Sequence, residues 1–172
     1  MDFLDIYRRF YEPESPLWAL LGLHSELVRR RAEQVLDRHP ELGADRALVV
    51  MGSLLHDIGI CRCDAPSIGC HGTEPYLRHG PIGAQMLRAL PEETFAPLSR
   101  EALARICERH TGTGLPGYEP ETLEEEIVCY ADKFFSKSHP ERERNVEQTA
   151  EMLSRFGDAS VEKFLGWAAR FE

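Results

Sequence analysis

The chain has 172 residues and a formal net charge of −9 at pH 7, with 42% hydrophobic and 28% charged residues. This length suits one domain with a substantial core, and the composition is ordinary for a soluble globular protein. The acidic balance argues against a broad basic surface, and so against nonspecific binding to a nucleic acid polymer or an anionic membrane.

The first predicted element is a short helix over about residues 2–11. This N-terminal segment is amphipathic and carries acidic residues, so it resembles neither a signal peptide nor a transit peptide. No stretch of the chain approaches the roughly 18 apolar residues that span a bilayer. Without a secretory signal, the five cysteines are expected to be reduced thiols, and we expect a cytoplasmic protein.

A long second helix is predicted to follow. Ser15 suits its N-cap, and Pro16 suits its first helical position. The apolar residues of this helix recur on one side, and His24 lies in line with them and not on the solvated face. Pro40 and Gly43 then predict its end.

The next helix, residues 46–55, is apolar nearly all round, which indicates a buried central helix. Asp45 is its predicted N-cap. His56 and Asp57 come directly after it, at its C-terminal end. Residues 59–72 contain proline, glycines and three cysteines, and predict an irregular segment.

Two more helices each align a histidine with their apolar residues. One begins near His79 and has Met86 on the same side. The other follows Ser99, and its apolar side, which includes Ile106, continues into His110. Both histidines are therefore expected to face the core.

The last part of the chain also has a helical period. Thr122 and Glu125 match a capping box, and Asp132 lies at the edge of the apolar side of the helix that they begin. Two further helices are predicted near residues 141–156 and 160–171. No convincing strand, repeat or long linker is present in the pattern, which favours an all-α fold.

The predicted architecture is a single-domain helical bundle over residues 1–172. Its core covers about residues 20–137, and C-terminal helices over about residues 141–171 cover that core.

Four histidines and two aspartates thus fall at helix ends or on inward-facing sides. Each alone has an ordinary explanation as a hydrogen-bonded core residue or a cap. Together they are too many polar groups for the interior of a small helical protein without a compensating partner. Imidazole and carboxylate suit iron, manganese, cobalt, nickel or zinc, so we predict a metal site. Its ligands would be His24, His56, Asp57, His79, His110 and Asp132.

Six ligands exceed the need of one open catalytic ion, so two divalent ions are predicted. The first would take His24, His56, Asp57 and Asp132. The second would take His79, His110 and again Asp57, which would bridge the two ions. The positive charge of two divalent ions exceeds the negative charge of two carboxylates and a shared hydroxide. The site would therefore stay net positive and would favour an anionic ligand such as phosphate.

Four sequence stretches resemble the HD-domain superfamily of metal-dependent phosphohydrolases. They are LLHDIG at 54–59, RHG-x-IGA-x-ML at 78–87, ERHTGTG at 108–114 and PETLEEEIVCYADKFF at 120–135. The resemblance is to small stand-alone HDIG proteins, spans about residues 20–137, and implies an all-α fold. The ligand positions of the family motif fall on His24, His56, Asp57 and Asp132. His79 and His110 match the subset of the family that holds a dinuclear centre.

Two departures from this family pattern concern the segment after the His-Asp pair. Many relatives have a lysine there, where it assists the attacking water, but here Ile60 follows Gly59 and the nearest cation is Arg62. The cysteine-rich stretch from Cys61 to Cys70 looks peculiar to this sequence.

The same stretch raises the question of a separate zinc site. Its candidate ligands are Cys61, Cys63, Cys70 and His71. Their spacing is not that of a standard zinc knuckle, which favours free loop thiols.

The sequence therefore predicts a metal-dependent phosphohydrolase that hydrolyses a phosphate ester or phosphoanhydride of a small substrate, with a nucleotide as one candidate. His56, Asp57 and Lys133 are the predicted catalytic residues. The substrate-binding candidates, chosen because they neighbour the ligands or share their helix side, are Arg31, Arg62, Arg78, Arg109, Lys133 and Lys137.

Two other functions are weighed against this one. The first is a mixed-valent di-iron oxygenase of the same superfamily, in which Tyr11 and Glu14, upstream of His24, could gate the site. The second is a noncatalytic ligand-binding module, against which the complete ligand set argues. The sequence does not determine the substrate or the native metal. The oligomeric state also stays open, and a homo-oligomer is one candidate.

Overall fold

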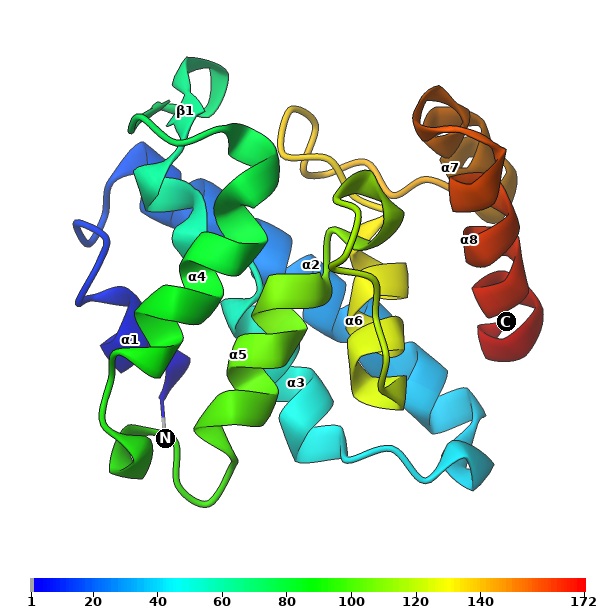
Figure 1. Ribbon diagram of the computed structural model, residues 1–172, viewed down its shortest axis with the longest axis horizontal. Coiled ribbons are helices and arrows are strands. Elements are labelled where there is room, and N and C mark those ends of the chain that lie inside the picture. The colour runs from blue at the N-terminus through cyan, green and yellow to red at the C-terminus, as the bar shows by residue number, and fades with distance from the viewer. Residues whose placement is uncertain (1) are drawn as a thin grey trace.

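A long helix, α2 (Pro16–Arg38), crosses the molecule, and α3 and α6 pack against it (Figure 1). The computed structural model describes residues 2–172. The remaining helices of this part are α1 (Phe3–Tyr7), α3 (Arg46–Leu55), α4 (His79–Arg88), α5 (Arg100–Arg109), α6 (Leu123–Asp132), α7 (Val146–Leu153) and α8 (Asp158–Phe171). The predicted all-α fold is confirmed. None of the described helices is long and apolar enough to cross a membrane.

At the starts of α2 and α6, the predicted capping side chains make the expected hydrogen bonds. Ser15 accepts a hydrogen bond from the backbone N–H of Trp18, and Pro16 is the first residue of α2. Thr122 and Glu125 form the reciprocal capping box at the start of α6. Caps of this kind satisfy backbone donors that would otherwise lack a partner, so they fix where each helix begins.

Three sequence predictions differ from the structure. The opening helix is shorter than residues 2–11, since α1 ends at Tyr7 and turns follow it. The seventh helix begins at Val146 and not near residue 141. A small antiparallel hairpin, β1 (Asp64–Ala65) with β2 (Cys70–His71), lies where no strand was predicted. A two-residue strand is too short to give an alternating pattern.

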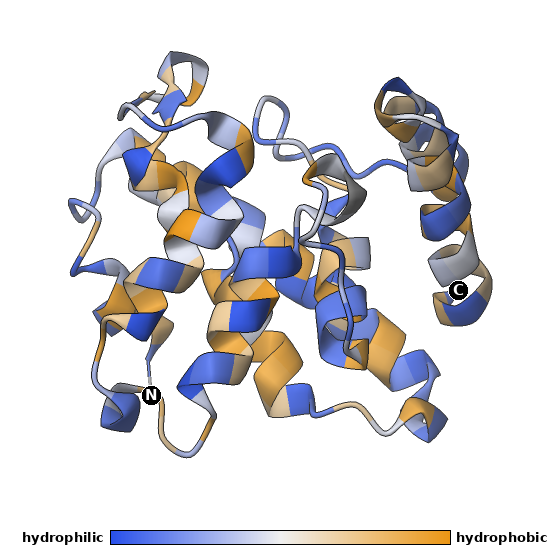
Figure 2. Cartoon of the chain, viewed as in Figure 1, coloured by the Kyte–Doolittle hydropathy of each residue, from blue (hydrophilic) through white to orange (hydrophobic). Residues whose placement is uncertain are grey.

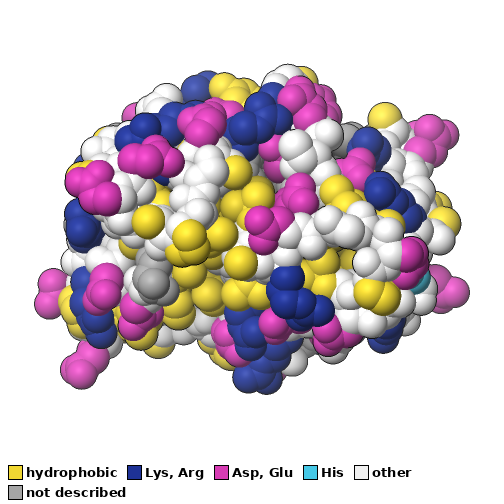
Figure 3. All heavy atoms as spheres, turned by 90° about the horizontal axis from the view of Figure 1, so that it is seen from below, with side chains coloured by type: hydrophobic (Ala, Val, Ile, Leu, Met, Phe, Trp, Pro, Cys, Tyr) yellow, Lys and Arg dark blue, Asp and Glu magenta, His cyan; other side chains and the backbone are white. Residues whose placement is uncertain are grey.

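The buried apolar residues form two clusters on either side of the middle of the bundle. The first joins the C-terminal half of α2 with α6, α7 and α8, and includes Val35, Tyr130 and Phe164. The second joins α1, the segment after α3, α4 and α5, and includes Ile58 and Leu87. Figure 2 shows hydrophobic residues concentrated where the central helices face one another. On the face shown in Figure 3, charged side chains of both signs surround a hydrophobic area.

Helices α7 and α8 form a pair at one end of the molecule (Figure 1). Phe164 and Phe171 of α8 pack into the first cluster. The Arg31 side chain of α2 pairs with Glu172 and Glu143, and its guanidinium lies 4.1 Å from the centroid of the Phe134 ring. Arg31 therefore joins α2 to the C-terminal end of the described chain.

Candidate metal centre

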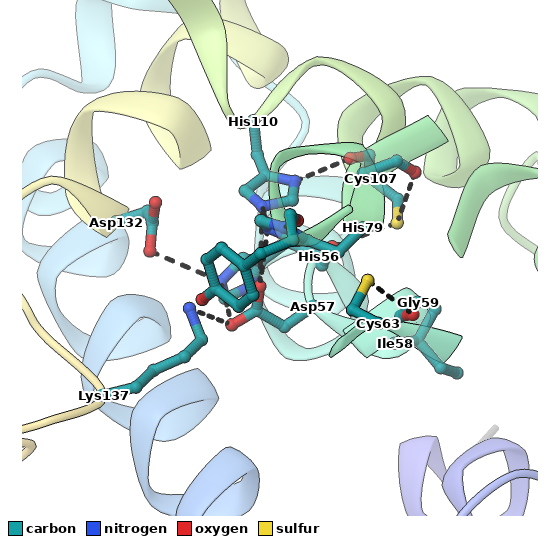
Figure 4. A network of polar contacts seen from close by, with 12 residues as sticks. His56, Asp57, Ile58, Gly59, Cys63, His79, Cys107, His110, Asp132 and Lys137 are labelled. Carbon is teal, nitrogen blue, oxygen red and sulfur yellow. Dashed lines mark hydrogen bonds and ion pairs between the residues drawn. The ribbon is translucent and has the colours of Figure 1, made fainter. Parts of the chain in front are cut away.

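The six residues predicted as ligands converge within the bundle, and Figure 4 shows His56, Asp57, His79, His110 and Asp132 close to one another. They come from five segments: the middle of α2, the ends of α3, α5 and α6, and the start of α4. His24, His56, Asp57, His79 and His110 are buried, and the Asp132 side chain is 15% exposed.

The two carboxylate oxygens of Asp57 face different histidine pairs. Oδ2 lies 3.3 Å from Nε2 of His24 and 3.2 Å from Nε2 of His56. Oδ1 lies 3.3 Å from Nε2 of His79 and 3.5 Å from Nε2 of His110. The donors thus form two groups that share Asp57, with spacings short enough for each group to hold a metal ion.

Asp132 belongs to the first of these groups. Its Oδ1 lies 3.0 Å from Nε2 of His24 and 3.5 Å from Nε2 of His56. The division of the donors is therefore the one expected from the sequence, with Asp57 in the shared position.

Backbone hydrogen bonds orient three of the histidine rings. Nδ1 of His56 lies 2.7 Å from the carbonyl oxygen of Ser53, and Nδ1 of His110 lies 2.6 Å from that of Cys107. His79 makes the same contact with Tyr76 at 2.5 Å. A carbonyl oxygen only accepts, so we assign the ring proton to Nδ1 in each case. Nε2 then carries the lone pair that a metal ion requires.

For His79 and His110 this assignment leaves two metal-donor nitrogens that face one another without a proton between them. Nε2 of His79 and Nε2 of His110 are 2.8 Å apart, and Nε2 of His24 and Nε2 of His56 are 3.3 Å apart. Both carboxylate oxygens of Asp57 are buried without a well-directed hydrogen bond. Such a set of acceptors repels itself unless a cation lies among them, so these residues fit bound metal ions.

The ionisable groups of the ion-free centre have pKa values that shift in different directions. Burial lowers the pKa of His110 to about 3, and burial lowers the pKa of His24. Burial alone would raise the pKa of Asp57, but the nearby charges of His56 and Lys137 hold it well below its usual range. For His56, burial lowers the pKa, and the charge of Asp57 with other contacts raises it to about 9. At pH 7 the ion-free centre therefore has an ionised Asp57 and neutral His24 and His110 rings, while His56 carries a proton that a bound metal ion would displace.

Two lysines flank the carboxylates. Lys137 Nζ lies 2.7 Å from Oδ2 of Asp57. Lys133 Nζ donates to the carbonyl oxygen of His110 at 2.9 Å and lies 3.3 Å from Oδ2 of Asp132. Lys137, from the segment after α6, thus places a positive charge beside the carboxylate of the His-Asp pair.

A cleft of about 500 Å³ opens onto this centre. Its polar end contains His79, Asp132 and the two lysines, Lys133 and Lys137. The rest of its lining includes apolar side chains from the hairpin, from the turn before α4, from the segment after α6, and from α7 and the turn after it: Ile68, Leu77, Phe135, Met152 and Phe156. Leu77 and Phe156 are unusually exposed for large apolar residues, at 44% and 40%. The sequence pattern did not indicate this wall, because its parts are far apart in the chain.

The other four substrate-binding candidates are not among the residues that line this cleft. Arg31 contacts the C-terminal residues described above. Arg109 donates to the carbonyl oxygen of Glu119 and pairs with Glu121 at 2.9 Å. Arg62 and Arg78 have exposed side chains. The structure thus brings only Lys133 and Lys137 of this set to the cleft.

Tyr11 supports the backbone beside the site and does not gate access to it. Its side chain is 5% exposed, and its hydroxyl donates to the carbonyl oxygen of Ile58 at 2.8 Å. The same hydroxyl accepts a hydrogen bond from the backbone N–H of Cys61 at 3.0 Å. Tyr11 therefore fixes the backbone directly after Asp57, which is a role that the sequence did not indicate.

The cysteine-rich stretch shows no separate metal cluster. Cys61, Cys63 and Cys70 are free thiols. Among the described residues, the metal-compatible groups are the two that share Asp57. The Cys70 thiol instead donates to the carbonyl oxygen of Ile60 at 2.8 Å. The interpretation as free thiols agrees with this geometry.

Gly59 allows the segment after Asp57 to cross α4 at close range. A Cβ atom at Gly59 would lie 2.1 Å from the carbonyl oxygen of His79 and 2.4 Å from the backbone nitrogen of Gly83. No side chain fits there without a backbone shift. This crossing brings His79 within reach of Asp57.

We expect Gly59→Ala to destabilise the protein by about 1–3 kcal/mol through overpacking and to weaken metal binding by displacing His79. Gly22→Ala is the matched control, because, apart from its chain neighbours and the backbone of its own helix, no atom lies within 4 Å of its Cβ position in α2. That change should stabilise by about 0.5–1 kcal/mol through helix propensity. Urea unfolding would measure the stability of both variants, and metal analysis would measure their metal content. Equal stabilities of the two variants would contradict the close packing of Gly59 against α4.

Comparison with known proteins agrees with this geometry. The family model described as "HD domain" matches residues 21–137. This match covers the whole set of candidate ligands and more than half of the chain. The chain belongs to the HD domain family. No solved structure matches it.

Curated relatives in archaea share this region. An uncharacterized protein of Methanocaldococcus jannaschii is 40% identical over 100 residues, which cover 51% of this chain and 48% of that protein. A protein of Picrophilus torridus named tRNA (cytidine(56)-2'-O)-methyltransferase is 32% identical over 129 residues, or 68% of this chain and 32% of that protein. The protein of the same name in Thermoplasma volcanium is 30% identical over 105 residues, or 54% of this chain and 26% of that protein. The HD chain therefore spans less than half the length of these relatives.

Proposed function

We propose that this HD-domain chain is a metal-dependent phosphohydrolase with a dinuclear centre. The observation that carries the proposal is the position of Asp57, whose two oxygens face two separate groups of histidine donors. His24, His56, Asp57 and Asp132 would hold one ion, and Asp57, His79 and His110 the other. Iron, manganese, zinc, cobalt and nickel all suit these ligands.

When bound, two such ions lower the pKa of water and stabilise the charge that develops in an in-line displacement at phosphorus. The protein's own residues would set the geometry. Asp57 and the histidines, held by their backbone hydrogen bonds, would fix the site before substrate enters. Lys137, at the cleft end of the centre, would bind a phosphate oxygen through a charge-assisted hydrogen bond.

Lys133 was predicted as a catalytic residue, and we propose a related role for it. Its Nζ is engaged by the His110 carbonyl and the Asp132 carboxylate. It would position Asp132 against the first group of donors and add positive charge beside the phosphate.

The cleft suits a small substrate. A volume of about 500 Å³ is in the range of pockets for small molecules, and its apolar wall would contact the part of the substrate that is not phosphate. A nucleotide is one candidate of this class. We propose a cytoplasmic protein without a membrane or nucleic acid polymer as partner, in keeping with the net charge of −9.

The test is turnover of a phosphate-ester panel by protein loaded with Mn²⁺ or Fe²⁺. We expect hydrolysis of at least one small ester, and we expect Lys137→Met to lower kcat/KM by about 10²-fold. Lys163→Met is the matched control, because Lys163 lies on α8 with an exposed side chain beside Glu126. Inactivity with every metal would contradict the proposal, and equal loss in both lysine variants would contradict the role of Lys137.

Two alternatives have distinct outcomes. A mixed-valent di-iron oxygenase would consume oxygen and give a paramagnetic signal from coupled iron. A noncatalytic module would bind its ligand equally well after His56→Ala. The methyltransferase activity named for two relatives is not proposed here, because the match covers a third or less of their lengths.

A further inference from the structure

A second, polar hollow adjoins the cleft. Its volume is about 270 Å³, and its lining residues are Ser136, His139, Arg142, Arg144, Gln148 and Glu151. Ser136 also lines the cleft of the metal centre, so the two hollows meet at this residue. Apart from Ser136, the lining of the second hollow lies outside the family match, in the segment before α7 and in α7 itself.

Arg142 and Arg144 line this hollow, and Arg155 lines the adjoining cleft. Arg142, Arg144 and Arg155 form no ion pair with a described carboxylate, whereas arginines elsewhere, such as Arg88 and Arg105, bind glutamates. Glu151 lines the hollow but pairs with none of the three. In a chain with a net charge of −9, unpaired cations at one place indicate a site for an anion.

The cation cluster has a defined framework. The backbone N–H of Arg144 donates to the carbonyl oxygen of Phe134 at 2.9 Å, and Ser136 and His139 form a backbone bridge. Arg155 lies at the other side, in the turn after α7, with its guanidinium 4.7 Å from the ring centroid of Phe156. These contacts join the hollow to the apolar wall of the cleft.

One donor in the hollow lacks an acceptor. Nη1 of Arg144 is buried and has no hydrogen-bond partner among the described residues. Burial, together with the positive charges of Arg155 and Arg142, lowers the pKa of the Arg144 guanidinium. Two features of this hollow are unfavourable: a buried N–H donor that lacks an acceptor, and positive charges that lie close to one another. A bound anion would relieve both.

We propose that this hollow binds a second phosphate group of the substrate, held apart from the phosphate at the metal centre. The planar guanidinium groups of Arg142 and Arg144 suit bidentate contacts with phosphate oxygens. The inference rests on the proposed hydrolase function and narrows it to small substrates that carry two separate phosphate groups. The metal centre would act on one of them, and the arginine cluster would select for the other.

The site can be tested without catalysis, on protein stripped of metal by EDTA. Isothermal titration calorimetry with inorganic phosphate should show binding that Arg144→Gln weakens by at least about 10-fold. Arg170→Gln, at an exposed arginine that pairs with Glu126, is the matched control and should leave the affinity unchanged. Arg142→Gln, at an exposed side chain, is the second variant in case Arg144→Gln impairs folding. Phosphate affinity that depends on Lys137 and not on Arg142 or Arg144 would overturn the site.

A second measurement tests whether the anion belongs to the substrate. Metal-loaded protein should bind adenosine 3′,5′-bisphosphate at least about 10-fold more tightly than AMP, and Arg144→Gln should abolish this preference. Equal affinities in the wild type would overturn the assignment to a substrate phosphate and leave a site for free anions. If the preference is present but no ester is hydrolysed, the hydrolase proposal fails and the anion site stands.

Discussion

Replacing Asp57 with asparagine should remove both metal ions at once. An amide keeps the size of the side chain but loses the charge and one of the two oxygen donors, and this residue is shared by both groups of donors. We expect the metal content of anaerobically purified protein to fall from two ions per chain to almost none. If the ions supply about 4 kcal/mol of transition-state stabilisation, activity falls by about 10³-fold.

Variants of single histidines test whether Asp57 is shared by the two groups of donors. His24→Ala and His79→Ala each remove a donor from one group only, so each should lose about one ion per chain. Asp64→Asn, at an exposed aspartate on the edge of the cleft, is the matched control and should keep both ions. If Asp57→Asn kept one tightly bound ion, the bridging position of Asp57 would be wrong.

Removing the ions should also lower the thermal stability substantially. An ion at 100 times its dissociation constant adds about 2.7 kcal/mol to the free energy of unfolding. A chain of this size shifts its Tm by about 2–4 °C per kcal/mol, so two ions correspond to about 10–20 °C. The physical cause is the set of facing donors, such as Nε2 of His79 and His110 at 2.8 Å, which repel one another without a cation.

Calorimetry before and after treatment with EDTA measures this shift, and adding back the metal should reverse it. The Asp57→Asn variant is the control, because its Tm should respond neither to EDTA nor to added metal. A wild-type Tm that is independent of metal would mean that the cluster is stable without ions.

The sequence predicted the helical fold and the convergence of the six candidate ligands for a clear physical reason. Each histidine lies in line with the apolar side of a helix or at the end of a buried one, so local periodicity determines that it faces the core. His24 and His110 show this directly. The capping residues Ser15 and Thr122 likewise act on neighbouring backbone groups, which makes the start of a helix a local property.

Other features depend on contacts between distant segments and could not be predicted. Arg31 lies two helical turns from His24 on the same side of α2, yet it pairs with Glu172 because α8 packs there. Lys137 reaches Asp57 from an irregular segment whose path has no periodic pattern. Tyr11 braces the backbone after Asp57 for the same kind of reason. Tertiary packing, and not local sequence, decides all three positions.

The division of the apolar interior into two clusters has a consequence for cooperativity. The metal centre takes residues from helices of both clusters: Asp132 comes from α6 of the first, and His79 comes from α4 of the second. Bound ions would link the two clusters through polar ligands, in addition to the apolar side chains that α2, α3 and α5 contribute to both. We therefore expect the loaded protein to melt in one sharp transition and the stripped protein to melt in a broader one, as its halves begin to unfold independently.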